Sequence, residues 1–176
     1  MKTNHNSVRF LCVTAMMTAL VAVMTAVPRI PIPLGYAHLG DAAIVLIVLF
    51  VGKREGIWAA AIGSALSDLL GGFPLWIVPT LIIKAVMAII IIRIAFDKNG
   101  ECKLFSARCM ISIVLSMLWM ALGYTVGGAI LYGGLLVGLT STPGLLLEGL
   151  VNLIVAYAAG AVMEKAQVRR LLHYSA

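Results

Sequence analysis

Charge is scarce in this chain: only 11% of its 176 residues are Asp, Glu, Lys or Arg, whereas 62% are hydrophobic. A soluble domain carries about a quarter charged residues and about half apolar ones. The mean hydropathy of +1.06 departs in the same direction, so the composition excludes a soluble globular enzyme and a disordered protein. A bilayer span needs about 20 apolar residues, and the length therefore indicates a small polytopic membrane protein without a separate soluble domain.

The residues of metal and catalytic motifs are also few. The three cysteines, Cys12, Cys102 and Cys109, are odd in number and form no CxxC, which argues against a disulfide framework or a zinc site. The sequence contains no Walker A motif, no G-x-S-x-G and no H-E-x-x-H. We therefore expect no enzymatic activity, no catalytic residue, no metal and no cofactor. Without an ATP-binding motif, any active transport by a chain of this size would need energy from elsewhere.

Six apolar runs, separated by prolines and glycines that interrupt helices, predict an all-α membrane protein with six transmembrane helices. The runs cover residues 8–27, 40–51, 57–70, 77–95, 110–131 and 143–163. The second and third are short for full spans, so we expect them to be tilted or extended by their flanks. The whole chain, 1–176, is expected to form one domain with short cytoplasmic tails of about 1–7 and 166–176.

Basic residues predict that both termini face the cytoplasm, because Lys and Arg collect on that side of a membrane. The net charge of +6 is explained in this way without nucleic-acid binding. With the N-terminus inside, only Arg29 falls outside and Lys84 within a span. The remaining lysines and arginines lie inside, namely Lys2, Arg9, Lys53, Arg54, Arg93, Lys98, Lys103, Arg108, Lys165, Arg169 and Arg170.

Polar side chains within the runs are expected to gather in the outer half of the bilayer. A charge inside a span costs about 2.5–3.5 kcal/mol, so it is usually paired or functional. The residues concerned are Asp41, Asp68, Lys84, Tyr124, Glu148 and Asn152. The outer loops above them carry Tyr36, His38, Phe73 and Trp76. This arrangement predicts a pocket that opens outward beneath an aromatic lid.

Each of these residues also has a structural interpretation. Lys84 with Glu148 is consistent with an ion pair that only supports the fold. Asp41 is typical of a helix cap, and Asp68 of a solvated helix end. Loop aromatics are common anchors at the membrane surface. The joint placement of Lys84, Glu148 and Asn152 in one half of the bilayer favours the binding site.

Small residues four positions apart form a second pattern, which allows close helix packing. Such pairs occur at Ala15 and Ala19 and at Gly123 and Gly127. Packing within the bundle explains each pair. The Ala15 and Ala19 stripe lies on the first helix, where it is also suited to face a partner subunit.

Three segments resemble the S component, or substrate-binding subunit, of an energy-coupling factor (ECF) vitamin transporter. They are Gly35-Tyr-Ala-His-Leu-Gly-Asp41, Gly63-Ser-Ala-Leu-Ser-Asp-Leu-Leu-Gly-Gly72 and Pro79-Thr-Leu-Ile-Ile-Lys84. The small-residue pattern of the first run also fits, and the resemblance covers about residues 8–166. It is strongest to the branch of riboflavin-, pyridoxine- and hydroxymethylpyrimidine-type proteins.

The resemblance implies a six-helix protein of the bacterial plasma membrane that binds a vitamin or precursor at its outer face. It implies partnership with a transmembrane coupling subunit and two ATPases, which supply the energy, and a toppling movement that releases the ligand inside. Ala15 and Ala19 correspond to the motif that contacts the coupling subunit. The implied binding residues are Lys84, Glu148, Asn152 and Tyr124, with Tyr36, His38 and Trp76 from the lid; Asp68 completes the predicted site.

The mixture of donors and acceptors suits a small ring that carries hydroxyl groups and a ring nitrogen. Lys84 donates hydrogen bonds, Glu148 accepts them and Asn152 does both, while Trp76 or Tyr36 can stack on the ring. A pyridoxine- or hydroxymethylpyrimidine-like heteroaromatic fits best, and riboflavin is a bulkier alternative. Two other classes remain open: a structural membrane protein, and a facilitator or channel that works without partners.

Overall fold

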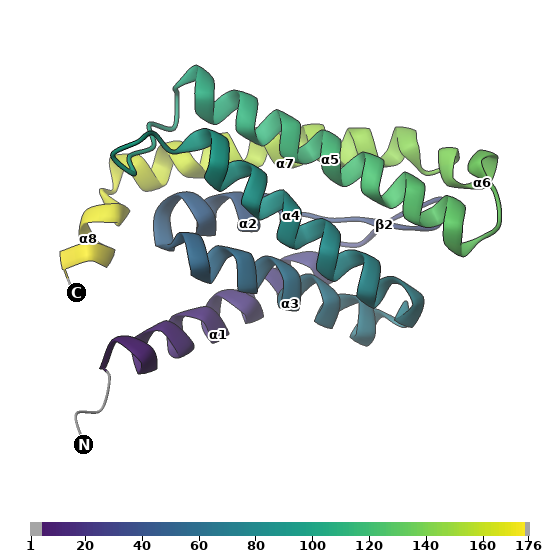
Figure 1. The fold of residues 1–176 in the computed structure, drawn as a ribbon, viewed down its shortest axis with the longest axis horizontal. Helices are drawn as coiled ribbons and strands as arrows, with labels where there is room; N and C mark the ends of the chain where they lie inside the picture. The colour runs from purple at the N-terminus through teal and green to yellow at the C-terminus, as the bar shows by residue number, and fades with distance from the viewer. Residues whose placement is uncertain (1–4, 175–176) are drawn as a thin grey trace.

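The computed structural model describes residues 5–174, and long helices that lie side by side make up most of it (Figure 1). Lys2, one of the predicted cytoplasmic cations, lies outside the described residues. The long helices are α1 (His5–Ala26), α3 (Lys53–Gly71), α4 (Ile77–Ala95), α5 (Ala107–Leu131) and α7 (Thr142–Lys165). Shorter elements are α2 (Gly40–Leu46), η1 (Ile47–Val51), η2 (Pro74–Trp76), α6 (Leu135–Leu139) and α8 (Val168–Tyr174).

The apolar runs predicted the positions of the five long helices and of the short helix at 40–51 closely, and the run at 77–95 coincides with α4. The runs did not predict α8, which lies in the expected C-terminal tail. The largest difference is the start of α3, which begins at Lys53 instead of residue 57. Lys53, Arg54 and Glu55 are good helix formers, but their polarity removes them from an apolar run. The helix begins before its hydrophobic part for this reason.

Four described segments are long and apolar enough to cross a membrane. They are Ser7–Ala26, Pro74–Ala95, Ala107–Leu131 and Leu135–Lys165. The second and third runs are different: Gly40–Val51 is a short apolar helix, and α3 has 19 residues. At about 1.5 Å per residue, the short helix spans only about 18 Å, compared with a hydrocarbon core of about 30 Å.

The short helix formed by α2 and η1 lies at the centre of the bundle. It contacts α1, α3, α4 and α7, and residues Ala42 to Val45 are 0–5% exposed. A helix that is apolar on every side is buried on every side. Its last part is π-helical, with Gly52 N–H donating to Ile47 O at 3.1 Å, and a sharp turn then leads into α3.

Close approach of α1 and α3 depends on Gly63. A Cβ atom at this position would lie 2.7 Å from the backbone oxygen of Thr18 and 2.8 Å from Cβ of Val21. These separations are shorter than van der Waals contact, so any side chain would push the two helices apart. The other face of α1 is consequently left on the outside of the bundle.

The segment between α1 and α2 contains a β-hairpin, so the expectation of a purely α-helical protein with an irregular loop here was incomplete. Strands β1 (Ile30–Ile32) and β2 (Gly35–Ala37) pair antiparallel, with Pro31 opposite Tyr36. Proline interrupts helices but is tolerated at the edge of a sheet, and a two-stranded ribbon has only edges. The prolines of this segment, which indicate a break in a helix, are therefore compatible with strands.

The two ends of the bundle differ. Both described termini lie at one end, together with the turn before α3 and the loop between α4 and α5 (Figure 1). The hairpin, the turn before α4 and α6 lie at the opposite end, here called the hairpin end. The predicted outer loop 132–142 folds partly into α6, where Gly138 packs so closely on α5 that a Cβ would lie 2.3 Å from Thr125 O.

Candidate ligand-binding site

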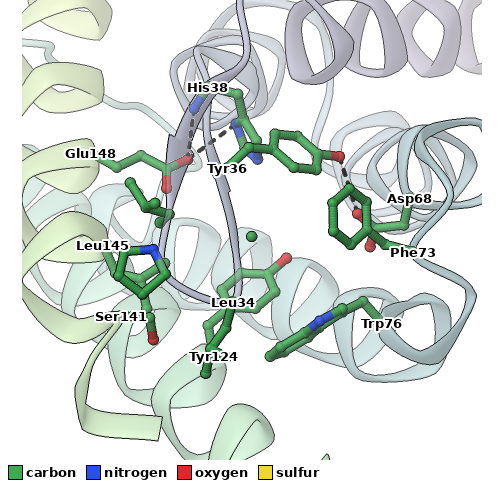
Figure 2. Close-up of a pocket in the computed structure, with 13 residues that line it drawn as sticks. Leu34, Tyr36, His38, Asp68, Phe73, Trp76, Tyr124, Ser141, Leu145 and Glu148 are labelled. Carbon is green, nitrogen blue, oxygen red and sulfur yellow. Dashed lines mark hydrogen bonds and ion pairs between the residues drawn. The ribbon is translucent and has the colours of Figure 1, made fainter. Parts of the chain in front are cut away.

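A cavity lies at the hairpin end, between the hairpin and the ends of α3, α5 and α7 (Figure 2). The space in it that the centre of a water molecule can reach is about 50 Å³. This is room for a few water molecules, each of which needs roughly 10–15 Å³ of such space. Its wall is formed by Ile32, Pro33, Leu34, Gly35, Tyr36, His38, Asp68, Phe73, Trp76, Tyr124, Ser141, Leu145 and Glu148. Aromatic and aliphatic groups dominate it, with two carboxylates, as is typical of small-molecule sites.

Tyr36 connects the hairpin to the end of α3. Its hydroxyl donates to Oδ1 of Asp68 at 3.2 Å and lies 3.3 Å from Oγ of Ser67. Its ring is 5.3 Å from that of Phe73, and the guanidinium of Arg29 stacks over it at 4.6 Å. These contacts hold one wall of the cavity through a single aromatic residue of β2.

Glu148 connects the opposite wall to the segment after the hairpin. Its Oε1 accepts from the backbone N–H of His38 at 3.2 Å and lies 3.2 Å from His38 Nδ1. The same Nδ1 accepts from the N–H of Gly40 at 3.2 Å. Figure 2 shows Glu148 and Asp68 on opposite sides of the cavity, with the aromatic rings between them.

His38 is neutral at physiological pH. Burial lowers its pKa from 6.5 to about 4, and the positive charge of Lys84 acts in the same direction, while Asp41 acts against both. The side chain is only 8% exposed, so an imidazolium would lose most of its hydration. His38 consequently supplies no positive charge to the cavity.

Trp76 and Tyr124 form the floor. Their ring centroids are 5.4 Å apart; Trp76 Nε1 donates to the hydroxyl of Tyr132 at 3.2 Å, and the Tyr124 hydroxyl donates to Oγ1 of Thr80 at 3.1 Å. Gly127 makes room for the indole, because a Cβ there would lie 3.1 Å from it. Both polar tips are satisfied by protein, which leaves the ring faces for contact with a ligand.

Asn152 lies behind the wall and is fully buried. Its Oδ1 accepts from the N–H of Ala42 at 2.8 Å. Its Nδ2 donates to His38 O at 2.7 Å and to Glu148 O at 2.9 Å. One amide therefore ties α7 to the first turn of α2 and to the segment leading out of the hairpin.

Lys84 also lies behind the wall, where its ammonium group forms an ion pair with Asp41. Both side chains are fully buried, and the ammonium is 5.2 Å from the centroid of the Tyr124 ring. The sequence had left open an ion pair of Lys84 with Glu148, but Glu148 contacts His38 instead. Asp41 was interpreted as a cap, yet α2 has no side-chain cap and Asp41 lies within its first turn.

The structure thus separates the predicted site residues into two layers. Tyr36, His38, Asp68, Trp76, Tyr124 and Glu148 line the cavity, whereas Lys84 and Asn152 lie behind it. Sequence reasoning missed Asp41 as the partner of Lys84, although its place in an apolar run was a signal. It also missed Leu34, Ser141 and Leu145, which have no distinguishing chemistry. Within residues 5–174 no group of three His, Cys, Asp or Glu is arranged to hold a metal.

The sequence matches the family model described as ECF-type riboflavin transporter, S component, over residues 5–165. The chain belongs to this family. The S component is also 36% identical over 115 residues to an uncharacterized protein from Pyrococcus woesei, a match that covers 64% of this chain and 74% of that protein. Membership establishes a multi-pass membrane protein that takes part in vitamin uptake as a transport subunit, not as an enzyme.

The ion pair behind the wall generates a test of stability. Replacing Lys84 with Met leaves Asp41 buried and unpaired, so we expect the free energy of unfolding to fall by about 3–5 kcal/mol. The double variant Lys84→Met/Asp41→Asn removes both charges and should recover much of this loss. Thermal unfolding of the purified protein in detergent measures both. A double variant no more stable than Lys84→Met would show that the pairing does not support the fold.

The lowered pKa of His38 predicts a loss of stability in acid. Between pH 6.5 and 4 the unfolded chain binds a proton at His38 and the folded chain does not, so stability falls as the pH falls. The shift of 6.5 to about 4 corresponds to on the order of 3 kcal/mol. Thermal unfolding from pH 7 to 4.5 should therefore decline less steeply in His38→Asn, whose Oδ1 can replace Nδ1. Parallel declines would contradict the assignment.

Proposed function

We propose that this S component captures a small heteroaromatic vitamin or precursor, with pyridoxine- and hydroxymethylpyrimidine-like compounds as the best candidates. The ligand is delivered for ATP-driven uptake by a separate module of a coupling subunit and two ATPases. The cavity at the hairpin end carries this proposal, since it combines stacking surfaces with hydrogen-bonding groups in a recess closed on the other side by the packed core. Family membership supports the coarse role, and the lining of the cavity supports the proposed substrate class.

The size of the cavity favours a single ring. The cavity volume of about 50 Å³ leaves little room for the three fused rings of riboflavin unless the hairpin moves. A substituted pyridine or pyrimidine needs less space and can lie against Trp76 or Tyr124. Hydroxyl or amino substituents would then reach the carboxylates of Asp68 and Glu148.

We further propose six membrane-crossing helices with the hairpin end outside. The short central helix needs the hairpin above it to fill the outer part of the bundle, and α3 completes the sixth crossing. The basic residues that flank the helices at the opposite end support a cytoplasmic location for that end.

The outer face of α1 is the proposed contact surface for the coupling subunit. Ala15 and Ala19 are both exposed, on the face of α1 that does not pack on α3. Their large neighbours Leu11 and Met16 are 64% and 66% exposed. A groove of small residues between large apolar ones allows a partner helix to approach closely in the membrane.

Replacing Trp76 with Leu should weaken ligand binding at least tenfold, because stacking and burial of one ring contribute about 1.4 kcal/mol or more. Titration calorimetry with pyridoxine and with 4-amino-5-hydroxymethyl-2-methylpyrimidine measures the effect, after native mass spectrometry of the purified protein for co-purified vitamins. Trp58→Leu is the control, because Trp58 is 52% exposed and does not line the cavity. Absence of any bound or binding vitamin would refute the proposed capture role.

Ala15→Trp or Ala19→Trp should leave ligand binding intact and abolish vitamin uptake, since the indole fills the groove on α1. Co-purification with the coupling subunit and ATPases, measured alongside binding, reports assembly directly. Leu118→Trp on α5 is the matched control, because Leu118 is also exposed, at 48%, but lies on another helix. Normal assembly of both alanine variants would show that Ala15 and Ala19 do not contact the coupling subunit.

A further inference from the structure

The wall of the cavity contains acidic side chains and no basic side chain other than the neutral His38. Among its thirteen lining residues, two are acids and none is Lys or Arg. Asp68 and Glu148 are 8% and 5% exposed and face each other across the space (Figure 2). Buried carboxylates are costly unless a compensating group meets them, so the identity of that group is informative.

Each carboxylate has one oxygen that accepts a hydrogen bond from the protein. Oε1 of Glu148 accepts from the backbone of His38, and Oδ1 of Asp68 accepts from Tyr36. Oδ2 of Asp68 is buried and has no well-formed hydrogen bond, although Thr80 lies nearby. A buried acceptor without a partner calls for an explanation, and a ligand donor in the adjoining cavity is one that the place of Asp68 in the wall allows.

The nearest cations of the protein are already engaged. Lys84 is behind the wall in its pair with Asp41. Arg29 lies outside the cavity, over the Tyr36 ring, and donates to the Ser67 backbone oxygen at 3.3 Å. His38 remains neutral, as described above. None of these three groups places a positive charge in the recess between Asp68 and Glu148.

Aromatic rings surround the same recess. Tyr36, Phe73, Trp76 and Tyr124 all line it, and their faces attract cations through the negative potential of the ring. Rings combined with carboxylates recognise an organic cation, in which a charged nitrogen is joined to an apolar body. A phosphate ester or a polycarboxylate meets only repulsion on this surface.

We propose that the ligand is a heteroaromatic compound with a positive charge, either a protonated amine substituent or a charged ring nitrogen, bound between Asp68 and Glu148. This proposal rests on the proposed function and narrows its substrate class. Asp68 supplies the unpartnered acceptor, Glu148 supplies a second carboxyl group on the opposite wall, and the four aromatic residues supply the stacking faces. Phosphorylated forms of the same vitamin are excluded from the site.

The matched probes are pyridoxamine and pyridoxine, which are both single rings and differ by an ammonium in place of a hydroxyl group. Pyridoxal 5′-phosphate serves as the anion and riboflavin as a neutral, larger vitamin. Titration of the purified full chain in detergent should give at least tenfold tighter binding of pyridoxamine than of pyridoxine, and no binding of the phosphate ester. This comparison uses the unmodified protein and does not depend on the folding of a variant.

Asp68→Asn should weaken binding of the cationic probe at least tenfold and change pyridoxine binding by less than threefold. Glu164→Gln is the control, because it removes an acid that is exposed near the other end of α7. Binding of riboflavin or pyridoxine as tight as that of pyridoxamine would overturn the charge proposal but leave vitamin capture standing. Failure of all the probes, together with no co-purified vitamin, would overturn both.

Discussion

The buried ion pair between Lys84 and Asp41 holds the start of the central helix, and the cavity depends on where that helix starts. Asp41 lies in the first turn of α2, where the helix dipole favours a negative charge, and Lys84 neutralises it from α4. Because α2 and η1 together are short, this start lies well below the hairpin end. The chain between α1 and α2 must cross the remaining depth, and the hairpin and the cavity occupy it.

Asn152 makes this arrangement specific. Its contacts with Ala42 N–H and His38 O fix the backbone at the point where the hairpin segment enters α2. Those backbone groups would otherwise be buried without partners, at a cost of about 1–3 kcal/mol each. The inner layer therefore acts on the position of the lining residues rather than on the ligand. The positions of Tyr36 and Glu148 therefore depend on this inner layer, which consists of Asp41, Lys84 and Asn152 and is here called the frame.

The sequence predicted the helices well because each is a long apolar segment ended by proline, glycine or charge. It predicted the hairpin poorly, since Pro31 and Pro33 obscure a strand pattern that is only three residues long on each side. It found Asp68, Tyr124 and Glu148 through the cost of polar groups in a membrane, and it found Tyr36, His38, Phe73 and Trp76 as residues of the outer loops. It could not assign partners: Lys84 has acids available at both 41 and 148, and only the packing of α2 between α1 and α7 decides between them.

The frame and the residues that line the cavity wall are separate sets of side chains. This separation explains how one architecture can serve different ligands. The frame consists of contacts between helices and with backbone groups, which are indifferent to what fills the cavity. The wall consists of side chains that project from the hairpin and from helix ends, so a change there alters charge and shape without moving the helices. Among the residues that the structure describes, Lys84 is the one buried lysine, and it pairs with Asp41 behind the wall. Lys84 is therefore not available to pair with Asp68 or Glu148 in the wall.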